Sequence, residues 1–436
     1  MEQTHGMILP ANHPLRQKLN DEVHARPPEE LNAPCSISYL ALFTDQAARK
    51  ESGTKVRELA ERFGASPPVE GANHYSAGLG PFRVKWERHS EFTRYEFIIG
   101  KDENPPFSDP PIRAVPQDWV ASLPGRLLVA TNIMVTRADS ALANLDDISA
   151  RYFDGNMLVG SLVSSGAARA ITDFRIHGDG FSRILIQDLT LTPRQTGRVV
   201  QRLVEIDSYR MTALLALPFA QELAPLITSW EGELVDITSA MVGSGEKDEP
   251  FLLDRLTKLE AEIESKRAAS AYRFSAAAAY YDIVQRRIVE LREERIQGLQ
   301  TFQEFMERRL EPAMSTCVAS TARQEALSTR VSRTMSMLST KVDVTLEQQN
   351  QAVLASMDRR AMLQLRLQET VEGLSVAAIT YYIVGLVGYA AKAAHAGGFE
   401  VNPELVMGIS IPLVAGAVAY GLSRFRARIA AAESKH

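Results

Sequence analysis

The sequence predicts an α+β protein in which a mixed, largely antiparallel sheet domain with helices precedes a long helical stalk and a C-terminal two-helix transmembrane hairpin. Strand-like segments fill the first half of the chain, a helix-forming stretch with one proline follows, and two charge-free apolar segments lie near the end. The expected parts are a cytoplasmic α/β domain (1–241), a linker (242–250), a helical hairpin or coiled stalk (251–372), a first transmembrane helix (373–391), an outer loop (392–404), a second transmembrane helix (405–423) and a basic cytoplasmic tail (424–436).

Composition limits the classes of partner and cofactor. The 436 residues carry a formal net charge of -5. A nucleic-acid partner is not expected, because phosphate binding needs a concentrated excess of Lys and Arg. Cys35 and Cys317 lie far apart without a CxxC spacing, so neither a disulfide framework nor a structural zinc site is expected. The sequence calls for no cofactor and identifies no set of metal ligands.

Several segments of the first half alternate apolar and polar residues with a period of two, which is typical of strands. In PFRVKWE, Phe82, Val84 and Trp86 fall on one face, and Arg83, Lys85 and Glu87 on the other, which predicts a half-buried strand. Glycines in HGDG (177–180) predict a tight reversal between two antiparallel strands. The expected strands are 35–43, 81–87, 92–99, 126–135, 156–165, 168–176 and 181–189.

A helix with a clear start follows the strands. Thr192, Pro193 and Gln195 fit the N-cap, the first helical position and the capping-box partner. The helix should continue to a kink or stop at Pro218, because proline cannot continue the hydrogen-bond ladder. The segment VGSGEKDEP (242–250) is the expected linker to the stalk.

The stalk contains a single proline between Phe251 and Glu372 and is rich in good helix formers. Pro312 is expected to end its first helix, and the second should run from about Ser315 unbroken into the membrane. Two apolar rows with alternating spacings of three and four predict a packed helical seam. This seam would join copies of the chain in an oligomer or close a helical hairpin within one monomer. The two rows are Leu252, Leu256, Leu259 and Ile263, and Val331, Met335, Leu338, Val342 and Thr345.

The two apolar segments near the end, 373–391 and 405–423, contain no charged residue. Each is about 28 Å long as a helix, close to the hydrocarbon thickness of a bilayer. Arginines stand before the first segment and after the second, whereas the connection offers only Lys392, so the positive-inside rule places both ends in the cytoplasm. The alternative is a buried helical hairpin in a soluble core.

Several long motifs in order resemble a bacterial family of uncharacterised membrane-anchored proteins, domain of unknown function 3422, over nearly the whole chain. This resemblance implies a location, the bacterial inner membrane, and no reaction. The motifs are HPLRQKLNDEVHARPP from His13, ERHSEFTRYEF from Glu87, TDFRIHGDGFSR from Thr172 and GRVVQRLVEIDSYRMTALLALP up to Pro218.

The layout is also similar to that of CorA-type divalent-cation channels, which join a cytoplasmic α/β domain to a long helix, two spans and a basic tail. That resemblance implies a pentamer with a Gly-Met-Asn motif at the outer end of the first span. The corresponding residues here are Gly388, Tyr389 and Ala390. Gly388 and Tyr389 are therefore the candidate pore residues, while Ala390 lacks the side-chain amide that would hold a hydrated cation.

Polar residues form one stripe of a short helix near the start, at His13, Arg16, Asn20 and His24, before the prolines that end it. The two histidines lie about 16 Å apart on such a helix and cannot share an ion without other elements. A surface or interdomain polar face, a ligand or anion site and a metal site remain open. For the ligand reading the candidate residues are His24 and Arg26.

A second set of polar residues lies on the expected hairpin. Asp173, Arg175 and His177 would alternate onto one strand face, with Arg183 on the returning strand. A carboxylate, a guanidinium and an imidazole side by side suit an anionic ligand or a proton transfer. The alternative is a cross-strand charge network on the wet side of the sheet.

Three function classes follow. The first is a membrane-tethered binding or scaffold protein that is oligomeric through its stalk and recognises a protein partner or a small anionic ligand. The second is a CorA-like divalent-cation channel without the Gly-Met-Asn signature, and the third is an enzyme held at the membrane. None of the common hydrolase, nucleotide or metalloprotease motifs occurs, so no catalytic residue is assigned.

Overall fold

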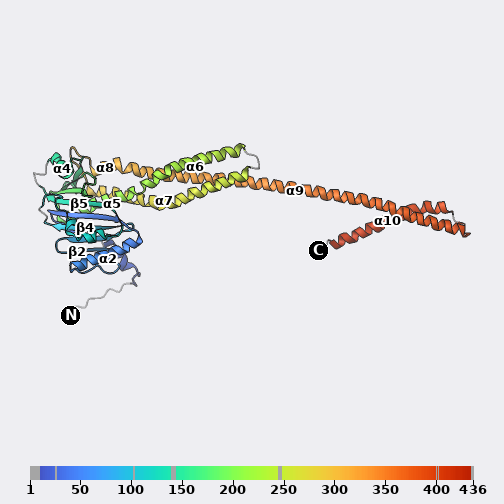
Figure 1. Ribbon diagram of the computed structural model, residues 1–436, viewed down its shortest axis with the longest axis horizontal. Coiled ribbons are helices and arrows are strands. Elements are labelled where there is room, and N and C mark those ends of the chain that lie inside the picture. Colours follow the sequence, from blue (N-terminus) through green and yellow to red (C-terminus); the bar gives the residue numbers. More distant parts are fainter. Residues whose placement is uncertain are drawn as a thin grey trace. The chain divides into compact units, whose positions relative to one another are not determined.

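The structure is a computed structural model that describes residues 10–24, 27–101, 104–138, 144–243, 248–398, 400 and 402–433. It divides into two compact units. The first unit comprises residues 1–243 and 254–335, and the second comprises residues 244–253 and 336–436. The predicted α+β class is confirmed, because a mixed nine-stranded sheet is combined with long helices (Figure 1).

The sheet lies in the first unit and has the order β2-β3-β4-β1-β5-β8-β7-β6-β9. All neighbouring strands are antiparallel except β5 and β8, which are parallel. Its strands are β1 (Cys35–Phe43), β2 (His74–Gly78), β3 (Arg83–Arg88), β4 (Phe92–Gly100), β5 (Arg126–Arg137), β6 (Val159–Val163), β7 (Ala168–Thr172), β8 (Ser182–Asp188) and β9 (Glu294–Arg295).

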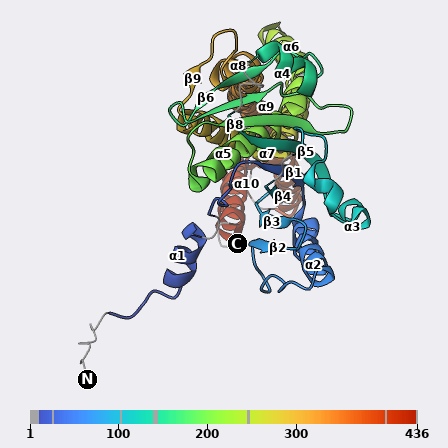
Figure 2. The ribbon, with the colours of Figure 1, turned by 90° about the vertical axis from the view of Figure 1, so that its left-hand side faces the viewer.

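Helices cover both faces of this sheet. The helical elements are α1 (Arg16–His24), α2 (Gln46–Arg62), the 3-10 turn η1 (Pro111–Ala114), α3 (Gln117–Ala121), α4 (Leu145–Tyr152), α5 (Pro193–Leu214), α6 (Leu217–Gly243), α7 (Glu249–Leu291), α8 (Phe302–Arg309), α9 (Glu311–Ala396) and α10 (Pro403–Glu433). Figure 2 shows the first unit turned toward the viewer, with β2 near α2 and β9 near α8.

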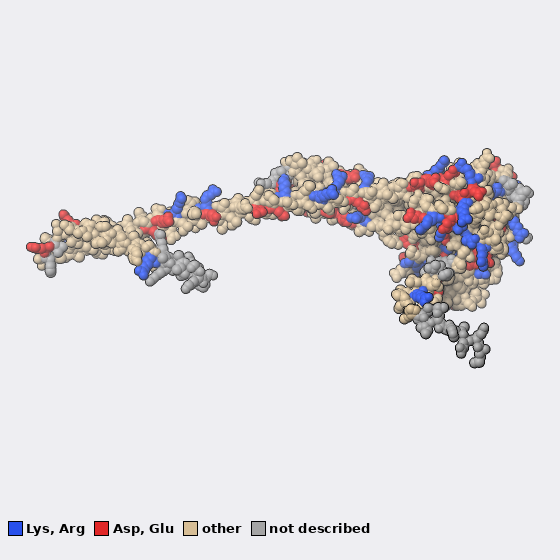
Figure 3. Space-filling view, turned by 180° about the vertical axis from the view of Figure 1, so that it is seen from behind, with Lys and Arg blue, Asp and Glu red and all other residues tan. Residues whose placement is uncertain are grey.

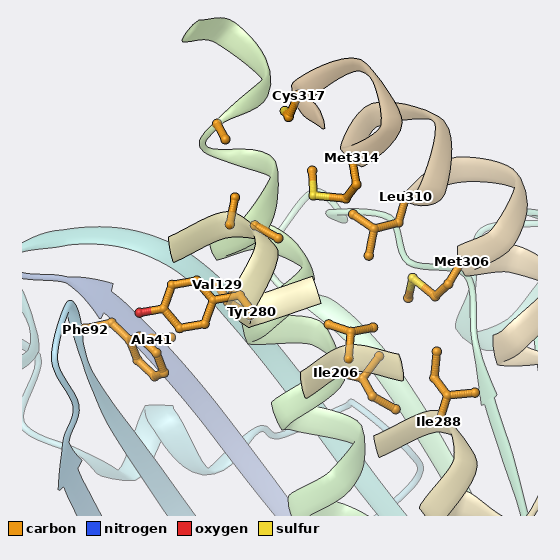
Figure 4. Close-up of a cluster of buried hydrophobic side chains, with 14 of the residues drawn as sticks. Ala41, Phe92, Val129, Ile206, Tyr280, Ile288, Met306, Leu310, Met314 and Cys317 are labelled. Carbon is orange, nitrogen blue, oxygen red and sulfur yellow. The ribbon is translucent and has the colours of Figure 1, made fainter. Parts of the chain in front are cut away.

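The larger core includes residues of one face of the sheet and of α5, α6, α7, α8 and α9 as far as Val331. Figure 4 shows part of it, in which Met306, Leu310 and Met314 lie near Ile206 and Ile288. The opposite face packs α2 and the aromatic pair Trp86 and Trp119 into a second core. Because each face is covered, the central strands are buried on both sides.

One strand prediction is wrong in an informative way. PFRVKWE forms β3, but its polar face is not wet, since Lys85 is 5% and Glu87 0% exposed. The alternation separates apolar from polar residues, yet it does not reveal that distant parts of the chain cover the polar face, as Pro27 does at Lys85. The strand is therefore buried on both faces.

The second set of candidate residues also lies differently from the prediction. β7 ends at Thr172, and Phe174 takes a positive φ of 54°, which breaks the extended backbone. Asp173, Arg175 and His177 thus belong to the β7–β8 connection and do not alternate along a strand. The tight reversal at HGDG is present, because the backbone N–H of His177 donates to the carbonyl of Phe181 at 2.9 Å.

The helix boundaries depart from the prediction at one proline. The capped helix α5 starts at Pro193, as expected, and ends at Leu214, just before Pro218. The next long helix, α7, ends at Leu291. Pro312 does not end it and instead lies in the first turn of α9, where a missing backbone N–H costs nothing.

Some residues of the predicted seam pack against residues of the same chain. In the first unit, Val331 of α9 and Leu256, Leu259 and Ile263 of α7 belong to one buried core. In the second unit, Thr345 donates to Glu249 at 3.2 Å. These contacts correspond to the helical-hairpin alternative for residues up to about 345.

Three helical stretches are long and apolar enough to span a membrane: Pro193–Gly243, Phe302–Ala396 and Pro403–Phe425. The first consists of α5 and α6, many of whose apolar residues belong to the core of the first unit. The other two contain the predicted segments, and none of the apolar window of Pro403–Phe425 is buried. Figure 3 shows few charged side chains on the part of the second unit that holds the apolar ends of α9 and α10.

Candidate functional site

Four charged side chains lie buried on the face of β3 and β4 that α5 covers. Lys85, Glu87, Arg94 and Glu96 are at most 5% exposed, and they will be called the charge cluster. Register explains their proximity, because Lys85 pairs with Glu96 and Glu87 pairs with Arg94 across the two strands. Buried ions of this kind cost several kcal/mol each unless they are paired, so the cluster needs its internal partners.

Glu87 is the centre of the charge cluster. Its carboxylate lies 3.1 Å from Lys85 Nζ and also contacts Arg94 and, at 3.6 Å, His89 Nε2. Arg94 lies 3.6 Å from Glu205 of α5 and 4.0 Å from Glu96. Positive and negative charges thus alternate through the interior.

The two carboxyl groups of the charge cluster shift in opposite directions. Burial alone would raise the pKa of Glu87, but His89, Arg94 and Lys85 together hold that pKa well below its usual range. Burial dominates at Glu96 and raises its pKa, although Lys85 and Arg94 oppose the shift. Oppositely shifted carboxyl groups are common at functional sites, and Glu96 is the member of this pair that can take up a proton.

The charge cluster adjoins a solvent-open cleft of about 670 Å³ along β2, the edge strand. Lys85 and Glu87 reach its inner wall. The cleft is bounded by residues 27–29 on one side and by Ser66–Val69 on the other, and is also lined by Ala72 and His74–Ala77. A volume in this range is typical of ligand pockets.

Residues 27–31 form a strap that crosses from the cleft to α5. Ser76 donates to Glu29 at 2.6 Å, and Lys85 donates to the carbonyl of Pro27 at 3.3 Å. At the other end, the N–H of Leu31 donates to the carbonyl of Pro193 at 3.0 Å. A Cβ at Gly197 would lie 1.7 Å from the carbonyl oxygen of Glu29, so α5 can accept the strap only because residue 197 is glycine.

The predicted residues on the β7–β8 connection form a separate site. His177 is buried and lies between two carboxylates, with Nδ1 2.8 Å from Asp154 and Nε2 3.1 Å from Asp173. Asn156 donates to Asp173 at 2.9 Å. The predicted proximity of Asp173 and His177 is thus present, but through a folded loop.

The two predicted arginines do not join that carboxylate–histidine group. Arg175 is exposed, and only its backbone N–H contacts Asp173. Arg183 donates to the carbonyl of Tyr152 at 2.7 Å and lies over the ring of Phe107. Of the N-terminal candidates, Arg26 lies outside the described residues, and His24 ends α1 with a side chain that is not described.

Backbone strain gathers around His177. Asp154, Phe174 and Phe107 take positive φ values of 53°, 54° and 64°. Such conformations cost about 1–3 kcal/mol each in non-glycine residues and are frequent at functional sites. Contacts with the surrounding residues must therefore hold the backbone of this loop in its strained conformation.

The candidate pore residues lie in the second unit. A pocket of about 720 Å³ between α9 and α10 includes Gly388, Tyr389 and Met407. A Cβ at Gly388 would lie 2.6 Å from Met407 Sδ, so Gly388 faces α10. Tyr389 is 74% exposed.

Carboxylate, ammonium, guanidinium and imidazole groups of this kind suit binding and proton exchange. Among the residues that the structure describes, no three His, Cys, Asp or Glu side chains converge as a metal site. Sequence reasoning missed the charge cluster and the strap. The signal was present, because residues of opposite charge stand two apart in both RVKWER and TRYEF.

A family model described as "Protein of unknown function (DUF3422)" matches residues 11–429. No curated protein and no solved structure matches the chain.

Proposed function

Because the chain belongs to the DUF3422 family of proteins of unknown function, we propose a function from geometry alone: it is a membrane-anchored binding or scaffold protein that presents its α/β unit in the cytoplasm as a homo-oligomer. The family supplies no reaction, and no nucleophile is assigned at the sites described above. The proposal therefore concerns where the protein is held and what it assembles with.

The proposal rests on the exposure of the middle of α9. Every residue from 346 to 371 is exposed, although the helix is continuous from Glu311 to Ala396. Many of these exposed residues are large and apolar. They are Leu346, Val353, Leu354, Met357, Met362, Leu363, Leu365, Leu367 and Val371, each more than half exposed.

A helix in this state needs a partner. Isolated helices are marginal in water, and most of their stability in proteins comes from packing an apolar face. Leu346, Val353 and Leu367 recur at multiples of seven residues, with Arg360 at the intervening position. This spacing suits a seam between parallel helices that is interrupted by one charged position. A second copy offers the same seam in the same orientation when both are fixed in one membrane, so the partner we propose is another copy.

The anchor is assigned to the apolar ends of α9 and α10. Support comes from the charges beside them, because the chain is rich in arginine before the first span and after the second and poor in basic residues between them. We place the protein in the bacterial inner membrane with both ends in the cytoplasm. The arginines are Arg359, Arg360 and Arg366, and Arg424, Arg426 and Arg428.

Cysteine labelling tests the anchor. Cys35 and Cys317 are buried, so a single exposed cysteine reports its own position. In intact spheroplasts a membrane-impermeant maleimide should label Gly397→Cys and leave Gln351→Cys unlabelled until the membrane is permeabilised. Labelling of both without permeabilisation, or release of the chain by alkaline carbonate, would contradict the proposal.

Disulfide trapping tests the oligomer. Under mild oxidation in native membranes, Val353→Cys should give crosslinked chains, whereas Gln351→Cys, on the opposite side of the heptad, should give few. Both positions are exposed in the monomer, so accessibility is matched. Equal crosslinking of the two variants would show that the chains collide at random and that α9 forms no specific seam.

A protein partner suits the α/β unit better than a small anion. Asp173 and His177 are engaged with each other, and Arg183 is engaged with Tyr152, which leaves Arg175 as the exposed cation of that set. If a small anion is the ligand instead, Arg175→Ala should lower the amount that copurifies.

A cation channel is the second candidate. The observation that favours it is a set of tyrosines exposed on the α9 span, Tyr381, Tyr382 and Tyr389, since bundled α9 helices would direct such residues at one another. Gly388 is unsuitable as a probe because it contacts α10. Divalent-ion uptake into proteoliposomes that Tyr389→Ala abolishes and Tyr420→Ala on α10 preserves would establish this function.

A further inference from the structure

The free edge of the sheet at β2 carries the strongest unassigned feature of the first unit. β2 is the last strand in the sheet order and pairs on one side only, with β3. Its five residues, HYSAG, contain no lysine, no proline and no acidic residue. Natural sheets often protect an edge with such residues, and β2 has none of them.

Register shows which backbone groups of β2 are free. The N–H of Arg88 donates to the carbonyl of Asn73, and the N–H of Leu79 donates to the carbonyl of Phe82. In an antiparallel pair, hydrogen-bonded residues alternate with residues whose N–H and C=O point away. His74, Ser76 and Gly78 therefore direct their backbone groups outward, and all three are exposed.

Within the described part of the chain, no hydrogen bond engages the backbone of these three residues. The edge forms the floor of the cleft described above, with the strap on one side and Ser66–Val69 on the other. The walls stand on opposite faces of β2, because Tyr75 donates to the carbonyl of Ser66 and the next residue, Ser76, donates to Glu29. They would obstruct a second copy of the sheet, which carries the same walls beside its own β2.

The two walls differ in chemistry. Pro67, Pro68 and Val69 present an apolar surface beside Tyr75. The strap presents the Glu29 carboxylate, which accepts from Ser76 at 2.6 Å and lies 3.9 Å from Arg83. Side chains of an added strand alternate between the two faces, so a strand with apolar residues on one face and basic residues on the other matches both walls.

We propose that β2 binds an extended peptide segment of a protein partner as an added strand, with alternating apolar and basic side chains. Main-chain hydrogen bonds to His74, Ser76 and Gly78 supply affinity, and the two walls supply the side-chain preference. This inference deepens the proposed scaffold function, on which it rests, by naming how the α/β unit holds a partner.

Fluorescence anisotropy with full-length protein in detergent tests this binding. The probe is a fluorescein-labelled, end-capped peptide in which valine and lysine alternate. Two further versions carry N-methyl groups on alternate amides, one on each edge of the peptide, and leave every side chain unchanged. Methylation of the edge that faces β2 should weaken binding about tenfold or more, whereas methylation of the other edge should leave it within about twofold.

Variants of Ser76 provide the matched test on the protein. Ser76→Pro removes an outward N–H, which an edge strand tolerates, and should weaken binding about tenfold. Ser76→Ala loses the same hydroxyl contact with Glu29 but keeps the N–H, so it should bind the probe clearly more tightly than Ser76→Pro. A probe in which glutamate replaces lysine should bind more weakly than the original, because Glu29 repels it.

Three results would overturn the proposal: no binding of the valine–lysine probe, equal binding of the two N-methylated probes, or equal binding to Ser76→Pro and Ser76→Ala. The N-methylated probes decide the matter with unaltered protein if Ser76→Pro fails to fold. Anchoring and self-association are measured by cysteine labelling and crosslinking. A failure here therefore leaves those results standing and removes only the strand site.

Discussion

Arg273 of α7 donates two hydrogen bonds to the carboxylate of Glu91, at 3.0 and 2.8 Å, and both side chains are buried. Glu91 lies between β3 and β4, so this ion pair fastens the sheet to α7. The paired geometry matches the two donors of the guanidinium to the two carboxylate oxygens. The pair joins residues that are far apart in the sequence.

Breaking this pair should destabilise the first unit strongly. Glu91→Gln leaves a buried guanidinium without its counter-charge, and loss of one partner of a buried pair costs about 3–5 kcal/mol. Urea unfolding in detergent, followed by tryptophan fluorescence, measures this, because Trp86, Trp119 and Trp230 all lie in the first unit. Arg267→Ala is the control, since its ion pair with Glu264 is exposed on both sides and is worth at most about 1 kcal/mol.

The strand pattern shows how much of the fold follows from the sequence. Strands rich in β-branched and aromatic residues, such as β1, β4 and β8, were predicted within a residue or two. β2 was not expected, because HYSAG has little strand propensity and depends on pairing with β3. Pairing between distant segments is absent from a local pattern, so the nine-strand order could not be predicted.

The candidate sites illustrate the same limit. Asp173 and His177 were predicted to be neighbours, and they are, but the positive φ at Phe174 brings them together through a loop. The alternation predicts that Lys85 and Glu87 lie on a solvent-exposed face. A period of two distinguishes the two faces of a strand, but it does not show what covers each face. Burial of that face depends on distant parts of the chain, since Lys85 donates to the carbonyl of Pro27 and Arg94 lies 3.6 Å from Glu205 of α5.

The strap should depend on a single glycine. In Gly197→Ala the added methyl group would lie 1.7 Å from the carbonyl oxygen of Glu29. Because this is a steric clash, the strap must move away from α5. We expect faster proteolytic cleavage near residues 27–31 and a lower free energy of unfolding. Gly53→Ala on α2 is the matched control, because its Cβ would meet Trp86 at an ordinary 3.6 Å, and alanine in a helix interior gains about 0.5–1 kcal/mol over glycine. Equal protease sensitivity of the two variants would contradict the seating of the strap.

The carboxyl groups of the charge cluster should give opposite pH dependences. Glu87 has a lowered pKa when folded, so it stabilises the fold above its ordinary value of 4.5 and loses that effect as the pH falls. Glu87→Gln should therefore be less stable than the parent near neutral pH, with a gap that narrows under acid conditions.

Glu96 should behave in the opposite sense. Its raised pKa means that the folded state holds a proton that the unfolded state releases at lower pH, so the stability of the parent falls as the pH rises from about 4.5 toward the folded pKa. Glu96→Gln removes this dependence and should gain stability relative to the parent as the pH rises. Urea unfolding at several pH values compares the two variants, and parallel curves for Glu87→Gln and Glu96→Gln would refute the assignment.

The carboxylate–histidine group should hold the strained β7–β8 connection in place. Nδ1 of His177 lies 2.8 Å from Asp154 and Nε2 lies 3.1 Å from Asp173, so the ring contacts both carboxylates. His177→Gln keeps one donor and should lose stability by about 1–3 kcal/mol, because a buried partner is left unsatisfied. Arg175→Ala is the control, since that side chain is exposed and should change stability by less than about 0.5 kcal/mol. Amide hydrogen exchange gives the local readout: His177→Gln should accelerate exchange at His177–Phe181 and leave β1 and β4 unchanged. If exchange in the loop matches the parent, the histidine does not hold the connection.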